Sequence, residues 1–183
     1  EQAEYARKHN SNPNIEIRLQ DYREFNEKVD RIVSVGMIEH VGQKNYKSFM
    51  RLAKKSLNEN GLFLLHTIGS PISSTITEPW IEKNIFPGGV LPSLAQLTKS
   101  AEGLFVIEDI HNFGSDYDLT LMAWHNNFVK AWPELKSGYD EKFYRMWRLY
   151  LLSCAGGFRA RSIQLWQLIL SPNGVSGGYK SIR

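Results

Sequence analysis

An acidic side chain and an imidazole stand side by side at Glu39 and His40, just after a short apolar run, 31–35, that Gly36 ends. The β-branched residues of this run predict a strand buried in the middle of a sheet. In open α/β sheets, ligands bind beyond the carboxyl ends of the strands, so the pair stands where a substrate would be handled. The alternative is that both side chains only satisfy backbone groups at a strand-to-helix turn.

Two further polar groups follow predicted strands. His66 lies near the end of the apolar run 62–67, and Tyr117 lies in a polar loop between Asp116 and Asp118. A carboxylate, an imidazole and a phenol that lie close together can orient a small anion or accept a proton. Spacing alone leaves open whether these groups converge. No HxxxH or CxxC spacing occurs, which disfavours a metal site.

The pattern of apolar residues predicts the strands that must position these groups. Residues 15–19 alternate between apolar and polar side chains, which is typical of a half-buried strand. A helix is expected between the strands 31–35 and 62–67, ending at Asn60 and Gly61. Strand, helix and strand in this order favour a parallel sheet wound with helices. The other predicted elements are the end of a helix over 1–10 and two strands over 105–110 and 163–170.

Two regions, 70–104 and 119–161, depart from this alternation. Four of the seven prolines lie between Pro71 and Pro92, in a stretch too long for an ordinary connection, so we expect a functional insertion there. Ser93 is expected to cap a short helix, and a helix over 119–131 is expected to break near Pro133. A long helix then carries one apolar face, formed by Phe143, Met146, Trp147, Tyr150, Leu151, Cys154 and Phe158. Its aromatic residues either pack in a core or line an apolar channel for a long ligand.

Composition sets the outer limits of the interpretation. A chain of 183 residues with 42% hydrophobic composition is long enough for one domain with a core of its own. A net charge of +3 is too small to indicate nucleic acid as a partner, but it is compatible with a surface near anionic lipid. One cysteine excludes an internal disulfide. The chain begins with Glu1 rather than Met, which suggests a fragment of a longer protein.

Four longer runs carry a resemblance to a known family: DRIVSVGMIEHVGQKNY, GLFLLHTIGS, HNFGSDYDLTLMAW and CAGGFRARSIQLWQ. They resemble the cyclopropane-fatty-acyl-phospholipid synthases, which are related to the mycolic acid cyclopropane synthases. The resemblance implies an α/β, Rossmann-like fold of an S-adenosylmethionine-dependent methyltransferase, incomplete here, with inserted helices over the active site. Residues 1–171 would be the carboxyl-terminal part of the methyltransferase domain, with insertions at about 70–104 and 119–161, and 172–183 would be a flexible tail.

The resemblance also implies a reaction and its site. A methylene group would pass from S-adenosylmethionine to the cis double bond of an unsaturated phospholipid acyl chain, through a carbocation that bound bicarbonate deprotonates. The positions that match the family's bicarbonate site are Glu39, His66, the backbone of Ile68 and Tyr117. Cys154 matches a family cysteine counted among the active-site residues, although a packing or acyl-channel role fits its apolar helix face equally well.

The cofactor site is represented only in part. Gln20, Asp21, Tyr22 and Arg23 match the part of the family site that borders the adenine. The glycine-rich loop that holds the rest of the cofactor has no counterpart, because no GxGxG follows a predicted strand. The isolated chain is therefore expected to be inactive. The alternative is a truncated, non-catalytic relative that binds lipid or a partner surface through its apolar helices.

The remaining expectations concern location and assembly. The resemblance implies a cytoplasmic protein that lies at the inner face of the membrane and forms a homo-oligomer. In the family's sheet, two strands that would precede Glu1 separate the strand 15–19 from the strand 31–35. Without them the strand 31–35 would be an exposed edge. We therefore expect the chain either to self-associate there or to move 15–19 directly against 31–35.

Overall fold

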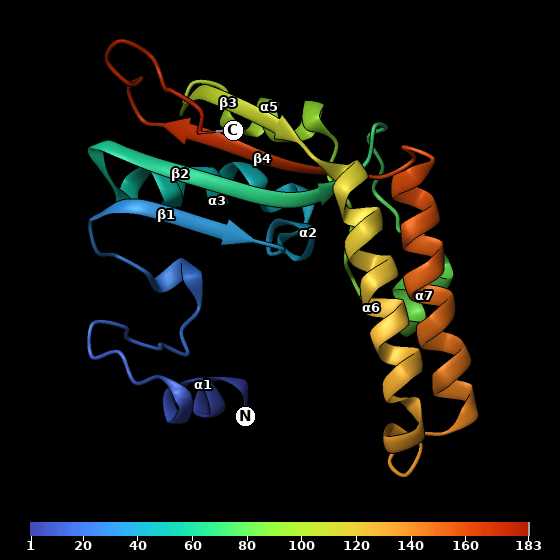
Figure 1. Cartoon of the computed structure of the whole chain (residues 1–183). Coiled ribbons are helices and arrows are strands. Elements are labelled where there is room, and N and C mark those ends of the chain that lie inside the picture. Colours follow the sequence, from blue (N-terminus) through green and yellow to red (C-terminus); the bar gives the residue numbers. More distant parts are fainter. Residues whose placement is uncertain (183) are drawn as a thin grey trace.

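The computed structural model describes residues 1–182, which form a mixed α/β fold around one four-stranded sheet. The strands are β1 (Val29–Val35), β2 (Leu57–Gly69), β3 (Val106–Asn112) and β4 (Gln164–Ser171), in the order β1-β2-β4-β3 (Figure 1). β1 and β2 are parallel, as the strand-helix-strand order predicted. β4 runs antiparallel to both of its neighbours, so the parallel arrangement that the strand-helix-strand order favoured does not extend to this strand.

Seven α-helices occur in the described part of the chain: α1 (Gln2–His9), α2 (Ile38–Val41), α3 (Tyr46–Ser56), α4 (Pro79–Asn84), α5 (Leu94–Ala101), α6 (Gly114–Leu135) and α7 (Glu141–Arg159). Helices α3 and α5 lie behind the sheet in Figure 1, whereas α6 and α7 form a long hairpin beyond the carboxyl ends of β1 and β2. The predicted cap of α5 is confirmed, because Ser93 Oγ accepts a hydrogen bond from Gln96 N at 3.1 Å. No helix within residues 1–182 has the length and apolar character that crossing a membrane requires.

The main core lies between the sheet and the α3–α5 layer. Alternate residues of β2 point into it, and Phe63 at its centre packs against the rings of Phe49 and Phe105 at centroid distances of 5.9 and 6.0 Å. A second core fills the α6–α7 hairpin, where Leu151 and Phe158 of the predicted apolar face are each 1% exposed. The fold therefore has two apolar cores, and the carboxyl ends of β1 and β2 lie beside the second one.

Helix α6 differs from the sequence prediction at both ends. The polar loop expected around Tyr117 is helical, because α6 already begins at Gly114. Gly114 packs so close to β4 that a Cβ atom there would lie 3.0 Å from the backbone nitrogen of Leu165. Pro133 lies inside the helix and does not break it; the proline lacks one N–H group, while Lys136 N still donates to Trp132 O at 2.9 Å.

The end of α3 was also predicted wrongly. The helix ends at Ser56, and β2 begins at once with Leu57. Leu57 pairs with Val29 and Leu62 pairs with Arg31, so the residues that were expected to close the helix form a bulge at the start of β2. Gly61 suits this bulge because a Cβ atom there would lie 2.9 Å from the carbonyl oxygen of Asn58.

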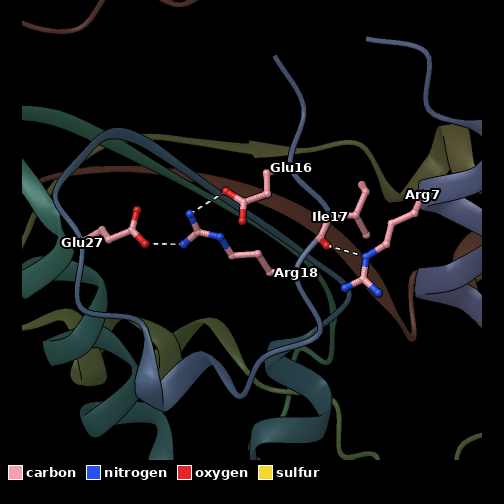
Figure 2. A network of polar contacts seen from close by, with 5 residues as sticks. All are labelled: Arg7, Glu16, Ile17, Arg18 and Glu27. Atoms are coloured by element: carbon pink, nitrogen blue, oxygen red, sulfur yellow. Dashed lines mark hydrogen bonds and ion pairs between the residues drawn. The ribbon is translucent and has the colours of Figure 1, made fainter. Parts of the chain in front are cut away.

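Residues 15–19 do not form the predicted strand, and they do not pair with β1. Side chains hold this segment instead: Arg7 Nε donates to Ile17 O at 2.9 Å, and Arg18 forms ion pairs with Glu16, at 2.6 Å, and with Glu27 (Figure 2). Apolar alternation is not sufficient for a strand, because a strand also needs a hydrogen-bonding neighbour. β1 is consequently an edge strand of the sheet.

The tail after β4 contains no helix or strand as far as the structure describes it, and residue 183 lies outside the described residues. Its first residues are nevertheless held. Val175 N donates to Glu108 Oε1 at 2.8 Å, and Gly174 N donates to Ser171 Oγ at 3.0 Å. The tail therefore starts against the β3–β4 edge of the sheet.

Candidate functional site

Glu39 and Ile68 meet where β1 and β2 end. Gly36 closes β1 with a φ of +62°, a conformation that favours glycine, and α2 follows within two residues. This turn buries Glu39 to 7% exposure, where its Oε1 accepts the backbone N–H of Ile68 at 2.9 Å. Val90 N donates to the carbonyl oxygen of Glu39 at 2.9 Å, which fastens the segment between α4 and α5 over the same turn.

His66 lies two residues before Ile68 on β2. It pairs with Val35 of β1 on one side and with Gln167 of β4 on the other, and the Gln167 amide nitrogen lies 3.2 Å from its Nδ1. Burial lowers the pKa of His66, and the negative charge of Glu39 opposes that shift. The neutral imidazole is therefore favoured, and when the Gln167 amide donates to Nδ1, the ring carries its proton on Nε2.

Tyr117 and Cys154 lie together in the α6–α7 hairpin. The Tyr117 ring packs edge-on against Phe158 at 5.1 Å and against Trp124 at 5.8 Å. Burial raises the pKa of Cys154 to about 11, and burial and then the charges of Cys154 and Tyr117 raise the pKa of Tyr150 to about 12. These polar groups consequently lie close together and are all neutral near pH 7.

The structure thus places the predicted site residues in two adjacent clusters. Glu39, His66 and Ile68 form the first, and Tyr117 and Cys154 belong to the second. The side chain of Ile68 packs against the hairpin core, and so does Phe113, whose ring lies 5.6 Å from His66. Within residues 1–182, apolar contacts and not polar bonds connect the clusters.

Asp118 and His40 have contacts of other kinds. Asp118 forms an ion pair with Arg159 at 2.8 Å that ties α6 to α7, which is a structural contact. His40 is exposed, and its ring lies 6.1 Å from that of Phe86.

A cavity of about 530 Å³ lies at the carboxyl end of β1, and all four residues that were matched to the adenine site line it. Those residues are Gln20, Asp21, Tyr22 and Arg23; the others that line it are Met37, His40, Val41, Asn45 and Ser48. The second group was not predicted as cofactor-binding, although its position just after the strand 31–35 was the signal that pointed there. The flat aromatic ring and hydrogen-bonding groups of this cavity fit a purine base.

The Asp21 carboxylate in this cavity already has hydrogen-bond and ion-pair partners within the chain. It accepts the backbone N–H of Arg23 at 2.9 Å and pairs with the Arg23 guanidinium at 2.5 Å, which lowers the pKa of Asp21 to about 2. Tyr22 packs edge-on against Phe49 at 5.7 Å, so its ring is anchored to the main core. A second cavity, of about 510 Å³, adjoins the first and is lined by the Arg18 network of Figure 2.

Two buried polar atoms on the neighbouring helices α2 and α3 have no hydrogen-bond partner: Glu39 Oε2 and the hydroxyl of Tyr46. A carboxylate oxygen of this kind can accept a hydrogen bond from a hydroxyl group of a small ligand. A neutral His66 can donate a hydrogen bond to an oxygen of the same ligand. Of the contacts expected for bicarbonate, Glu39 and His66 are therefore available, whereas the Ile68 N–H already donates to Glu39. No group of three or more His, Cys, Asp or Glu side chains that could hold a metal ion occurs in the described part of the chain.

The sequence model of the mycolic acid cyclopropane synthetase family matches residues 1–168. The chain is 51% identical over all 183 residues to the cyclopropane-fatty-acyl-phospholipid synthase of Escherichia coli strain K12, and it covers 48% of that protein. It thus spans about half the length of these curated relatives. The cyclopropane synthase MmaA2 from Mycobacterium tuberculosis has the same fold, with a TM-score of 0.82 and 28% identity over 92% of this chain and 64% of that one.

A second solved structure is equally similar. It is the mycolic acid cyclopropane synthase CmaA1 complexed with SAH and CTAB, which aligns with a TM-score of 0.82 and 28% identity over 93% of this chain and 66% of that one. These likenesses confirm the resemblance and the Rossmann-like methyltransferase fold that the four sequence motifs indicated.

Proposed function

Because the chain belongs to the mycolic acid cyclopropane synthetase family, we propose that it is part of a cyclopropane-fatty-acyl-phospholipid synthase. The enzyme would transfer a methylene group from S-adenosylmethionine to the cis double bond of an unsaturated phospholipid acyl chain. The observation that carries this proposal is the 51% identity over the whole chain to a protein of that name. The cavity formed between residues 20–23 and the segment that follows β1 supports the cofactor part of it.

When bound, S-adenosylmethionine supplies an electrophilic methyl group. Tyr22 and Gln20 would hold its adenine in the cavity beside β1. The aromatic rings of Tyr117 and Tyr150 would provide an apolar wall beside a positively charged acyl intermediate, because the faces of such rings attract cations. A cation of this kind reacts with any water nearby, so excluding water is as important as positioning.

Proton removal would rest on the first cluster. Glu39 Oε2 and His66 would hold bicarbonate, which supplies the base, with the Tyr117 hydroxyl on the hairpin side. Glu39 Oε1 accepts the Ile68 N–H, and the Gln167 amide contacts His66, so each side chain already has one polar contact before a ligand binds. Pre-oriented polar groups in a buried site lower a barrier more than mobile ones do.

The same proposal includes where the protein acts in the cell and what the 183 residues can do by themselves. We infer a cytoplasmic protein that lies at the inner face of the membrane, where its acyl-chain substrate is. The 183 residues by themselves are expected to be inactive, because they contain no glycine-rich cofactor loop. The second candidate is a non-catalytic relative that binds lipid or a partner surface through its apolar helices.

The test compares the full-length protein that carries this chain with the 183 residues alone. Both receive S-adenosylmethionine, bicarbonate and vesicles of unsaturated phospholipid, and cyclopropane fatty acids are measured by gas chromatography with mass spectrometry. We expect product from the full-length protein, less product when bicarbonate is removed, and none from the 183 residues. Cofactor binding without product from the full-length protein would favour the non-catalytic alternative.

Cys154→Ser and Cys154→Ala are expected to retain measurable activity in the full-length enzyme, with Ala no worse than Ser. The reason is that burial raises the pKa of this thiol to about 11, so below pH 9 it is a neutral packing group and not a thiolate. Alkylation by iodoacetamide should be slow at pH 7 and become faster as the pH approaches 11. Complete loss of activity in both variants, with unchanged circular dichroism, would show that the thiol itself is required.

A further inference from the structure

We propose that Tyr46 is a positioning residue for Glu39, and that its hydroxyl donates to Glu39 Oε2 through one bridging water molecule. The inference rests on the proposed function, in which Glu39 helps to hold the base. It adds Tyr46 to the site residues. The sequence analysis did not identify this residue, because it lies among the apolar residues of α3 and is typical of a core position.

The first observation is that both groups are buried and lack partners. Tyr46 is 3% exposed and Glu39 is 7% exposed, and neither the hydroxyl nor Oε2 has a hydrogen-bond partner. A buried polar atom without a partner is costly, and nearly all such atoms in folded proteins are satisfied. A phenol is a donor and a carboxylate oxygen is an acceptor, so each group supplies what the other lacks.

The second observation is their proximity. Glu39 lies in α2 and Tyr46 begins α3, two helices that contact one another. Burial and then the negative charge of Glu39 raise the pKa of Tyr46 to about 12, as expected for two groups on contacting helices. The phenol consequently keeps its proton across the working range of an enzyme and remains able to donate.

The third observation is that the Glu39 carboxylate has only one fixed oxygen. Its Oε1 is held by the Ile68 N–H at 2.9 Å, but that bond alone leaves the group free to tilt about this contact. A second contact from a rigid donor would fix its plane. The Tyr46 ring is rigid, because it belongs to the buried main core together with Ile38 and Met50.

Ser34 provides a matched control. Its Oγ is also buried and without a partner, and it lies on β1 close to the same end of the sheet. Ser34→Ala and Tyr46→Phe each remove one buried, unpartnered hydroxyl and leave packing nearly unchanged. Only the tyrosine is expected to act on Glu39.

The experiment measures Tyr46→Phe and Ser34→Ala in the full-length enzyme. We expect Tyr46→Phe to lower kcat about 10-fold, with the KM for S-adenosylmethionine unchanged, because a positioning contact acts on the reaction step and not on cofactor binding. The carboxylate infrared band of Glu39, identified by its loss in Glu39→Gln, should shift in Tyr46→Phe and stay in place in Ser34→Ala. An unchanged kcat together with an unshifted band in Tyr46→Phe would overturn the proposal.

A separate measurement tests the contact between Tyr46 and Glu39 and needs neither an activity assay nor the Tyr46→Phe variant. It therefore applies even where that variant does not fold. In Glu39→Gln the titration of Tyr46, followed by its ring signals in nuclear magnetic resonance, should move to lower pH, because the charge that raised its pKa is gone. An unmoved titration would overturn the proposal. If the unaltered enzyme forms no product while the infrared and titration shifts are observed, the proposed function fails and the Tyr46 contact stands.

Discussion

Replacing Glu39 by glutamine is expected to lower turnover of the full-length enzyme by roughly 100-fold or more while leaving S-adenosylmethionine binding nearly intact. The change keeps the shape of the side chain and removes its charge. It leaves one side-chain oxygen to accept the Ile68 N–H, but an amide nitrogen then replaces either that acceptor or Oε2. An amide N–H in place of Oε2 can accept neither from the proton-bearing oxygen of bicarbonate nor from the Tyr46 side.

The measurement pairs the rate of cyclopropane formation with calorimetry of cofactor binding. Glu78→Gln is the matched control, because Glu78 also accepts a backbone N–H, that of Ile81 at 2.9 Å, yet lies on the surface at the start of α4. We expect the control to keep normal activity. Near-normal turnover in Glu39→Gln would remove Glu39 from the reaction, whatever its geometry.

The strands and long helices could be predicted because their signals are local. The apolar runs of β1 and β2, the apolar face of α7 and the cap at Ser93 each depend on residues within one element. The strand predicted over 15–19 failed for the opposite reason. Its alternation is real, but a strand needs a neighbour, and an ion-paired Arg18 holds this segment in another conformation.

The site was predictable to the extent that it follows strand ends. Glu39 and Ile68 meet because β1 and β2 are parallel neighbours, which the strand-helix-strand order implied. The placement of Tyr117 depended on a helix that begins earlier than its polar residues suggested. Tyr46 was missed because an aromatic residue on the apolar side of a helix looks like core, and only the burial of its unpartnered hydroxyl distinguishes it.

The exposed side of β1 leads to the other large expected effect, which is self-association of the 183-residue chain. β1 ends the sheet, and within residues 1–182 it pairs only with β2. Val33 is 67% exposed and Val35 is 61% exposed, so apolar surface lies beside the free backbone groups of this edge. The opposite edge differs, because the tail donates from Val175 N to Glu108 beside β3. An exposed apolar edge is a template for pairing with another chain.

We therefore expect light scattering to give about twice the mass of one chain at concentrations of tens of micromolar, falling toward a single chain on dilution. Val33→Lys should shift this equilibrium to the single chain, because a charged side chain at a sheet edge opposes pairing between chains. Val106→Lys, on the other edge strand, is the matched control: Val106 is 46% exposed, and the substitution should leave the mass unchanged. The mass of a single chain at every concentration would show that the β1 edge stays unpaired in solution. Equal effects of Val33→Lys and Val106→Lys would show that the contact between chains does not involve β1 specifically.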